Sequence, residues 1–185
     1  MISKMIIDAD ICIKLGGSDK YRYLYDILPL VSSEIYMHEH AHNEVMLPSS
    51  AVRQLNDLIK EKKVILVNEN SLSDIEKAVY QASVKKLSSV MIDPRRPNKN
   101  KGEVCSLAYA KATNIPYFAT DERDLQPIID SQLNIGINDI SCIRIIDIVY
   151  MIRDGKIEIS RKVTKAMWYL TGKSKEYFDT VIWPI

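Results

Sequence analysis

The chain alternates short apolar runs with longer segments whose apolar residues recur at helical spacing. Five runs are predicted as strands, namely 5–7, 34–37, 64–67, 116–120 and 142–146. The first of them is wholly apolar, as in a sheet that is covered on both faces. Helical spacing is illustrated by the segment 48–62, where Val52, Leu55 and Leu58 fall on one face. Strands that alternate with helices predict a three-layer α/β/α fold with a mainly parallel central sheet.

Local signals place several element boundaries. Ser73 is followed three residues later by Glu76, which is the pattern of a capping box, so a helix is expected to begin there. The segment 93–102 is rich in proline and asparagine and contains a glycine, and it is expected to be a loop. A helix over 103–113 should then lead through a tight turn at Asn114 into the fourth strand.

No linker, internal repeat or low-complexity segment divides the sequence. We therefore expect one core domain over 1–150 and a helical tail over 151–185 that packs on the same domain. The tail carries one apolar stripe at helical spacing, formed by Val163, Met167 and Leu170. Aromatic residues favour interfaces, and the aromatic end of the tail, 177–183, is a candidate homodimer interface.

Composition and charge serve mainly to exclude classes of protein. No apolar run approaches the about 20 residues that a membrane span needs, and no signal peptide is evident, so we expect a cytoplasmic protein that does not enter the membrane. The formal net charge is only +1, so any surface that binds nucleic acid must be local. The three cysteines are widely spaced in apolar segments and are predicted to be buried thiols.

Four carboxylates stand where apolar segments end or helices begin. Asp8 and Asp121 end the first and fourth strands, Glu103 begins the helix before the fourth strand, and Glu44 lies in a short helical segment. The carboxyl ends of strands in an open α/β sheet border the crevice where ligands bind. Converging carboxylates repel one another in a low dielectric, unless a cation neutralises them or some stay protonated. The pattern therefore predicts a site for a hard divalent cation.

The order of elements supports this grouping. The helix that begins at Glu103 and the strand that ends at Asp121 run in opposite directions, so the two carboxylates are expected at the same edge of the sheet. Asp8 and Asp10 would point the same way in an extended backbone, and both are candidate ligands. The alternative is local, because aspartate often caps helices and glutamate in a first turn complements the helix dipole.

Four segments together resemble the PIN-domain family of metal-dependent ribonucleases, which includes many bacterial toxins. They are Ile6-Ile7-Asp8-Ala9-Asp10-Ile11-Cys12-Ile13, His42-Asn43-Glu44-Val45, Lys101-Gly102-Glu103-Val104-Cys105-Ser106-Leu107-Ala108 and Phe118-Ala119-Thr120-Asp121-Glu122-Arg123-Asp124-Leu125. The resemblance covers residues 4–150 and implies four catalytic acids, Asp8, Glu44, Glu103 and Asp121. Asp124 matches a further acid of some members. The position of Asp10 is more often a small polar residue in the family, and the tail is longer than the family core requires.

The resemblance implies hydrolysis of RNA phosphodiester bonds with Mg²⁺ or Mn²⁺, the hard cations that carboxylate oxygens suit. The implied ligands are the four catalytic acids, with Asp10 and Asp124 as further candidates. RNA is the implied substrate, and the toxins of the family suggest an antitoxin-like protein partner. A basic loop precedes Glu103, and its candidate contacts to RNA phosphates are Arg95, Arg96, Lys99 and Lys101. The alternative for this loop is plain exposure to solvent.

Two other functions fit parts of the pattern. Asp8-Ala9-Asp10 after an apolar strand resembles the nucleophile and acid of haloacid-dehalogenase-type phosphatases, but this interpretation gives Glu44 no role. The other is a catalytically silent PIN-like module that binds RNA or protein. His38, His40 and His42 fit polar surface or an active-site rim better than zinc, because no cysteine or aspartate joins them at ligand spacing.

Overall fold

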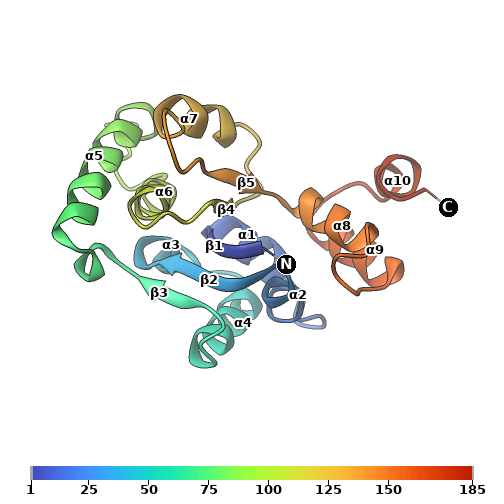
Figure 1. Cartoon of the computed structure of the whole chain (residues 1–185). Helices are drawn as coiled ribbons and strands as arrows, with labels where there is room; N and C mark the ends of the chain where they lie inside the picture. Colours follow the sequence, from blue (N-terminus) through green and yellow to red (C-terminus); the bar gives the residue numbers. More distant parts are fainter. Residues whose placement is uncertain (1, 185) are drawn as a thin grey trace.

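Five parallel strands form the centre of the molecule, with helices on both faces, in the computed structural model, which describes residues 2–184 (Figure 1). The strands are β1 (Ile2–Ile7), β2 (Ser32–His38), β3 (Ile65–Val67), β4 (Tyr117–Ala119) and β5 (Ser141–Ile143). Their order in the sheet is β3-β2-β1-β4-β5, and every pairing is parallel. The predicted three-layer α/β/α class is therefore confirmed, with a sheet that is wholly parallel.

The helices that precede β4 are α1 (Ala9–Gly16), α2 (Tyr23–Val31), α3 (Glu39–Glu44), α4 (Ser49–Lys60), α5 (Asp74–Met91) and α6 (Lys101–Ala112). A short 3-10 turn, η1, covers Glu69–Ser71. The helices that follow β4 are α7 (Leu125–Gln132), α8 (Ile145–Arg153), α9 (Arg161–Leu170) and α10 (Lys175–Tyr177), and a π-helical turn, η2, covers Phe178–Ile182. Figure 1 shows α8, α9 and α10 together on one side of the sheet-containing body.

Two predicted boundaries are wrong. Lys101 and Gly102 belong to α6 and not to the loop, because the left-handed conformation of Asn100 (φ 62°) ends the loop two residues earlier than predicted. The segment 144–146 does not extend the fifth strand, because Arg144 is the N-cap of α8 and Ile145 begins that helix. The reason is local, since Asp147 accepts a hydrogen bond of 2.8 Å from the backbone N–H of Arg144 and so fixes the start of that helix.

Other local signals are confirmed. Ser73 caps α5, and its hydroxyl accepts from the backbone N–H of Glu76 while the Glu76 carboxylate accepts from the backbone N–H of Ser73 at 2.8 Å. Asn114 adopts the left-handed conformation (φ 56°) that turns the chain from α6 into β4.

The core consists of two layers, one on each face of the sheet, because successive side chains of β1 point to opposite faces. Met5 and Ile7 pack with α1, α2 and α4, whereas Ile6 packs with α5, α6 and α7 on the other face of the sheet. The helix α6 is buried along nearly its whole length. This burial fixes the position of its amino end, which carries Glu103 and lies beside the carboxyl edge of the sheet.

The tail shares the first core layer. Met167 and Trp168 of α9 and Phe178 of η2 are buried in the same cluster as Ile7. Arg161 ties the end of the chain to α9, because its guanidinium donates to the carbonyl of Trp183 at 2.7 Å. The predicted apolar stripe is wrong in part. Val163 and Leu170 are 41% and 44% exposed, and Thr164 takes a buried place on this helix instead.

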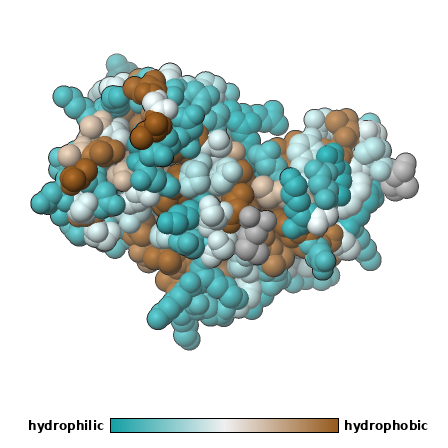
Figure 2. All heavy atoms as spheres, viewed as in Figure 1, coloured by the Kyte–Doolittle hydropathy of each residue, from teal (hydrophilic) through white to brown (hydrophobic). Residues whose placement is uncertain are grey.

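The visible surface is mostly hydrophilic, with hydrophobic residues in small separate groups (Figure 2). Among residues 2–184, no helix combines the length and the apolar character that crossing a membrane would require.

We expect the tail to contribute strongly to stability. Phe178→Ala removes a ring that is fully buried, which should lower the free energy of unfolding by about 3–5 kcal/mol. Val181→Ala, three residues away and 54% exposed, is the control and should change it by less than about 0.5 kcal/mol. Urea denaturation measures both. Equal midpoints for the two variants would show that the tail is only loosely attached.

Candidate metal centre

The carboxyl ends of β1 and β4 meet at the point where the strand order reverses. From β1 the chain continues to β2 on one side, and β4 pairs on the other side. Ile7 pairs with Ala119, and the backbone N–H of Asp8 donates to the carbonyl of Ala119 at 2.9 Å. Open α/β sheets bind ligands in the crevice at this position. Asp8 and Asp121 follow the two paired residues and therefore border it.

Asp8 is the residue between β1 and α1, and its side chain is 1% exposed. It stands at the N-cap position, yet its carboxylate makes no capping hydrogen bond. Both carboxylate oxygens are buried without a hydrogen-bond partner. Burial raises the pKa of Asp8 well above its ordinary value, and the neighbouring Glu103 and Asp10 carboxylates raise it further. The capping alternative therefore does not explain this side chain.

Glu44 is the last residue of α3, and its carboxylate rests against the first turn of α6. Its Oε1 accepts a hydrogen bond of 3.0 Å from the backbone N–H of Gly102. A Cβ atom at Gly102 would lie only 2.8 Å from that oxygen, so this close approach requires glycine. Burial raises the pKa of Glu44, although the hydrogen bond from Gly102 works in the opposite direction.

Glu103 lies in the first turn of α6, next to the glycine that orients Glu44. It is 9% exposed, and its Oε2 is buried without a hydrogen-bond partner. Burial raises the pKa of Glu103 to about 7, and repulsion from Glu44 contributes to the increase.

Asp8, Glu44 and Glu103 form one group. Each offers a carboxylate oxygen, and these oxygens lie within 4.8 Å of one another. They come from three separate elements, so the group exists only in the folded chain. The orphaned, buried oxygens and the oxygen-only donor set fit a hard cation such as Mg²⁺ or Mn²⁺. We call these three residues the carboxylate group.

Asp121 is bound by lysines. Its Oδ2 lies 3.0 Å from Nζ of Lys14 and 2.8 Å from Nζ of Lys173. Burial alone would raise the pKa of Asp121, but the hydrogen bonds from Lys173 and Lys14 hold it below its ordinary value. The structure thus brings together three of the four expected acids and places Asp121 beside them in an ion-paired network.

Asp10 belongs to the same network. It lies in α1, not in extended backbone, so the expectation that it shares a face with Asp8 by strand alternation is wrong. The helix begins directly after Asp8, and the Asp10 carboxylate remains close enough to raise the pKa of Asp8 and of Glu103. Its Oδ2 accepts from Lys14 at 3.0 Å, and its Oδ1 accepts from the backbone N–H of Asp121 at 3.1 Å.

The remaining predicted site residues lie apart from the carboxylate group or at its margin. Asp124 is exposed at the N-cap of α7 and makes no capping hydrogen bond. Arg95, Arg96 and Lys99 are exposed in the loop between α5 and α6. Lys101 is half-buried at the first position of α6, two residues before Glu103.

One of the three histidines is buried. His38 is 0% exposed and stacks against His40 and Tyr80, so the expectation of polar surface is wrong for this residue. Burial lowers the pKa of His38 to about 4, which leaves the ring neutral near pH 7. Its Nδ1 accepts from the backbone N–H of His40 at 3.2 Å and caps α3. His38 therefore helps to position the helix that ends at Glu44.

Two residues of the network escaped the sequence analysis. Lys14 stands four residues after Asp10 on a helix, which is a recognisable ion-pair spacing. Lys173 lies in the tail, 52 residues after Asp121, and no local pattern points to their contact.

Comparison with known proteins leaves the function to be argued from this geometry. No protein-family model, curated protein or solved structure matches the chain.

The raised pKa of Glu103 makes stability depend on pH. The folded state holds this proton more tightly than the unfolded state, so the contribution of Glu103 to the free energy of unfolding falls as pH rises from about 4.5 to about 7. Glu103→Gln removes this contribution. In a chelator, the variant should therefore gain stability relative to wild type as pH rises from 5 to 8, as urea titrations at each pH would measure. Glu158→Gln, at an exposed glutamate between α8 and α9, is the control. A stability difference between Glu103→Gln and wild type that does not vary with pH would contradict this account.

Gly102→Ala should weaken metal binding without lowering the stability of the fold. The added Cβ meets the end of the flexible Glu44 side chain, which can move away without displacing the backbone. Alanine is also favoured over glycine in a helix by about 1 kcal/mol. We expect an unchanged or higher melting temperature with a loss of roughly 10–100-fold in Mn²⁺ affinity, measured by calorimetry.

Gly136→Ala is the matched control, because a Cβ at that glycine would meet nothing within 4 Å. Equal Mn²⁺ affinities for the two alanine variants would show that the position of Glu44 does not matter for the metal.

Proposed function

We propose that this protein is a PIN-like, metal-dependent nuclease that hydrolyses RNA phosphodiester bonds. The observation that carries the proposal is the carboxylate group at the crevice of a parallel sheet, in which both oxygens of Asp8 and one oxygen of Glu103 are buried without a hydrogen-bond partner. Buried carboxylates without partners are costly in the absence of a cation. Functional sites are where such a cost is commonly found. The PIN-like order of acidic segments along the chain supports the same assignment.

Asp8, Glu44 and Glu103 are the residues that would hold Mg²⁺ or Mn²⁺. The bound ion would supply a Lewis acid beside the scissile phosphate. The chain contributes the alignment, because the Gly102 amide fixes one oxygen of Glu44. Burial in the crevice shields Asp8 and Glu103 from competing water.

Positive charge beside the carboxylate group suits a polyanionic substrate. Lys14 and Lys173 are held in place by Asp121, so two ammonium groups border the crevice. Lys101 stands at the amino end of α6, close in sequence to Glu103. Lysines placed in this way attract phosphates independently of base sequence. In this proposal Asp121 acts as a positioning residue for the two lysines.

A phosphatase with Asp8 as covalent nucleophile fits the geometry less well. That chemistry needs Asp10 as a free acid next to the nucleophile. The Asp10 carboxylate is instead engaged by Lys14 and by the backbone N–H of Asp121. The raised pKa of Asp8 also opposes its action as an anionic nucleophile without a cation.

The nuclease proposal predicts metal-dependent cleavage of RNA. Wild-type protein should cleave an end-labelled single-stranded RNA with Mn²⁺ and not in a chelator. Asp8→Asn should lower the rate by about a hundredfold or more, the usual cost of removing one electrostatic contact to a reaction centre. Asp139→Asn is the matched control, because Asp139 is exposed and precedes β5 at the opposite edge of the sheet. This variant should cleave RNA at the wild-type rate.

Two results would contradict the proposal. Absence of metal-dependent cleavage would assign the fold to a silent binding module. Fluoroberyllate trapping on Asp8, with hydrolysis of phosphate monoesters, would assign it to the phosphatase class.

A further inference from the structure

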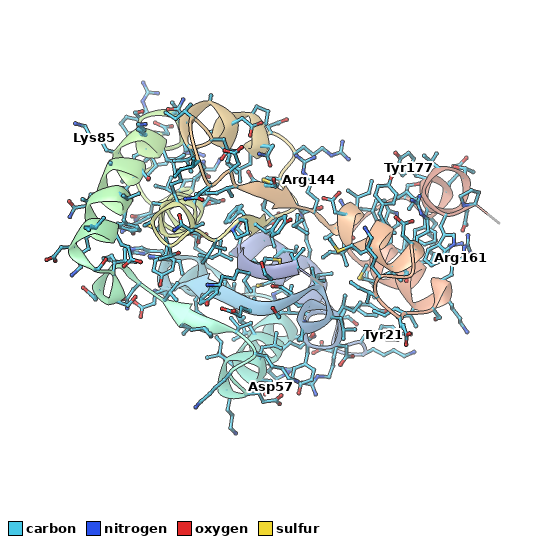
Figure 3. All side chains as sticks on the ribbon, viewed as in Figure 1. Tyr21, Asp57, Lys85, Arg144, Arg161 and Tyr177 are labelled. Atoms are coloured by element: carbon cyan, nitrogen blue, oxygen red, sulfur yellow. The ribbon has the colours of Figure 1, made fainter. Side chains whose placement is uncertain are left out.

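A cleft of about 800 Å³ lies between the carboxyl ends of β4 and β5 and the tail. Its basic lining residues are Lys14, Arg123, Arg144 and Lys173. Trp168 and Tyr177 of the tail supply an aromatic wall, and Asp121 is the acidic residue of the lining. In Figure 3, Arg144 lies at the sheet side and Tyr177 on the tail, which places them on opposite walls. A volume of this size is in the range of small-ligand sites, about 300–1,000 Å³.

The charge of the cleft favours an anion. Asp10 and Asp121 together offset the charge of Lys14 and Lys173. The guanidinium groups of Arg123 and Arg144 have no further carboxylate in the lining. Arg144 is held by a hydrogen bond of 2.8 Å from its Nη2 to the carbonyl of Arg123, and its Nε is buried without a partner. A guanidinium that lines the cleft and is held in place by the backbone is suited to a phosphate oxygen.

The aromatic wall favours a flat ring. Trp168 is anchored, since its Nε1 donates to the carbonyl of Ser174 at 2.8 Å and thereby fixes the turn before α10. The Tyr177 ring lies 6.5 Å from the Trp168 ring at an angle of 22° and is 45% exposed. Lys173 lies 5.2 Å above the Trp168 ring. An accessible aromatic face beside cations is the combination that binds a base and its phosphate together.

Asp121 and Asp10 connect the lining of the cleft to the carboxylate group. Asp121 lines the cleft, and its backbone N–H donates to Asp10, which belongs to the helix that follows Asp8. Asp8 in turn donates its backbone N–H to β4, two residues before Asp121. A nucleic-acid strand that runs from the carboxylate group past Asp121 would enter the cleft.

We propose that this cleft binds one nucleotide of a single-stranded RNA, with its base on Tyr177 and its phosphate on Arg144, Arg123 and Lys173. A single strand is required because a base must leave its stack to reach the tyrosine face. The assignment of the bound strand as substrate rests on the proposed nuclease function, whereas the binding itself needs no metal. The tail, which lies outside the region of PIN resemblance, would then select the substrate.

Binding to a fluorescein-labelled hexauridylate, followed by anisotropy in a chelator, tests the proposal without cleavage. Tyr177→Ala should weaken binding by roughly tenfold, the usual effect of losing one base stack. Arg123→Ala should lower the log–log salt slope by about 0.7, the value for one phosphate contact of a single strand. Both side chains are exposed, so the variants should keep the melting temperature of wild type.

Tyr169→Ala and Lys175→Ala are the matched controls. These two side chains lie in the same tail, where Lys175 sits 3.7 Å above the Tyr169 ring, and neither lines the cleft. We expect both controls to bind within twofold of wild type. Equal affinities for Tyr177→Ala and Tyr169→Ala would overturn the proposal.

Two competitors of the labelled hexamer test whether the cleft binds single-stranded RNA, a free nucleotide or duplex RNA. Uridine monophosphate that competes as well as the hexamer would assign the cleft to free nucleotides and overturn the RNA assignment. Duplex RNA that binds as tightly as the single strand would overturn the role of base stacking.

The same variants in the Mn²⁺ cleavage assay keep this proposal distinct from the nuclease function. If wild type and Tyr177→Ala bind RNA with equal affinity and cleave it at equal rates, the nuclease proposal is supported and the nucleotide-binding cleft is wrong. If Tyr177→Ala loses RNA binding and wild type cleaves no RNA, the cleft is supported and the nuclease proposal is wrong.

Discussion

Mutual repulsion among three converging carboxylates, two of them buried, is the constraint on which the rest of this structure depends. Their oxygens lie within 4.8 Å of one another, and burial raises the pKa of each. In water such groups would separate and be hydrated. Here the fold holds them together, because Asp8 is tied to β4 through its backbone, Glu44 ends a capped helix, and Glu103 begins a buried one. The amino end of α6 offsets part of the charge, and a cation would offset the rest.

The surrounding charges are arranged as a second layer. Lys14 and Lys173 meet at Asp121, so the fourth acid is neutralised by the chain itself and its pKa stays low. One of these lysines is in the tail, which is anchored by Trp168 and Phe178 in the main core. The tail therefore does more than cover apolar surface, since it completes the electrostatics of the crevice and forms one wall of the adjoining cleft.

The sequence was sufficient for the architecture and for bringing three acids into one candidate site. The apolar runs predicted the five strands, because a parallel sheet buried on both faces needs such runs. Acids at strand ends and at one helix start predicted the carboxylate group, because the topology gathers those positions at one edge. Prediction from the sequence failed where a single helical turn decides which way a side chain points. Asp10 was grouped with Asp8 on the premise of extended backbone, yet α1 begins immediately after Asp8.

Long-range contacts were out of reach for a different reason. The pairing of Lys173 with Asp121 and the burial of neutral His38 among aromatic rings depend on packing between distant segments. Polarity alone suggested an exposed histidine, whereas the structure uses its Nδ1 to cap α3. No periodicity in the sequence encodes either feature.

The most direct test of the central claim is an anomalous difference map from crystals grown with Mn²⁺ near neutral pH. The account predicts a manganese peak between the carboxylates of Asp8, Glu44 and Glu103, at coordination distance from an oxygen of each. A map without a peak there, or with the ion bound by Asp121 in place of its lysines, would contradict it.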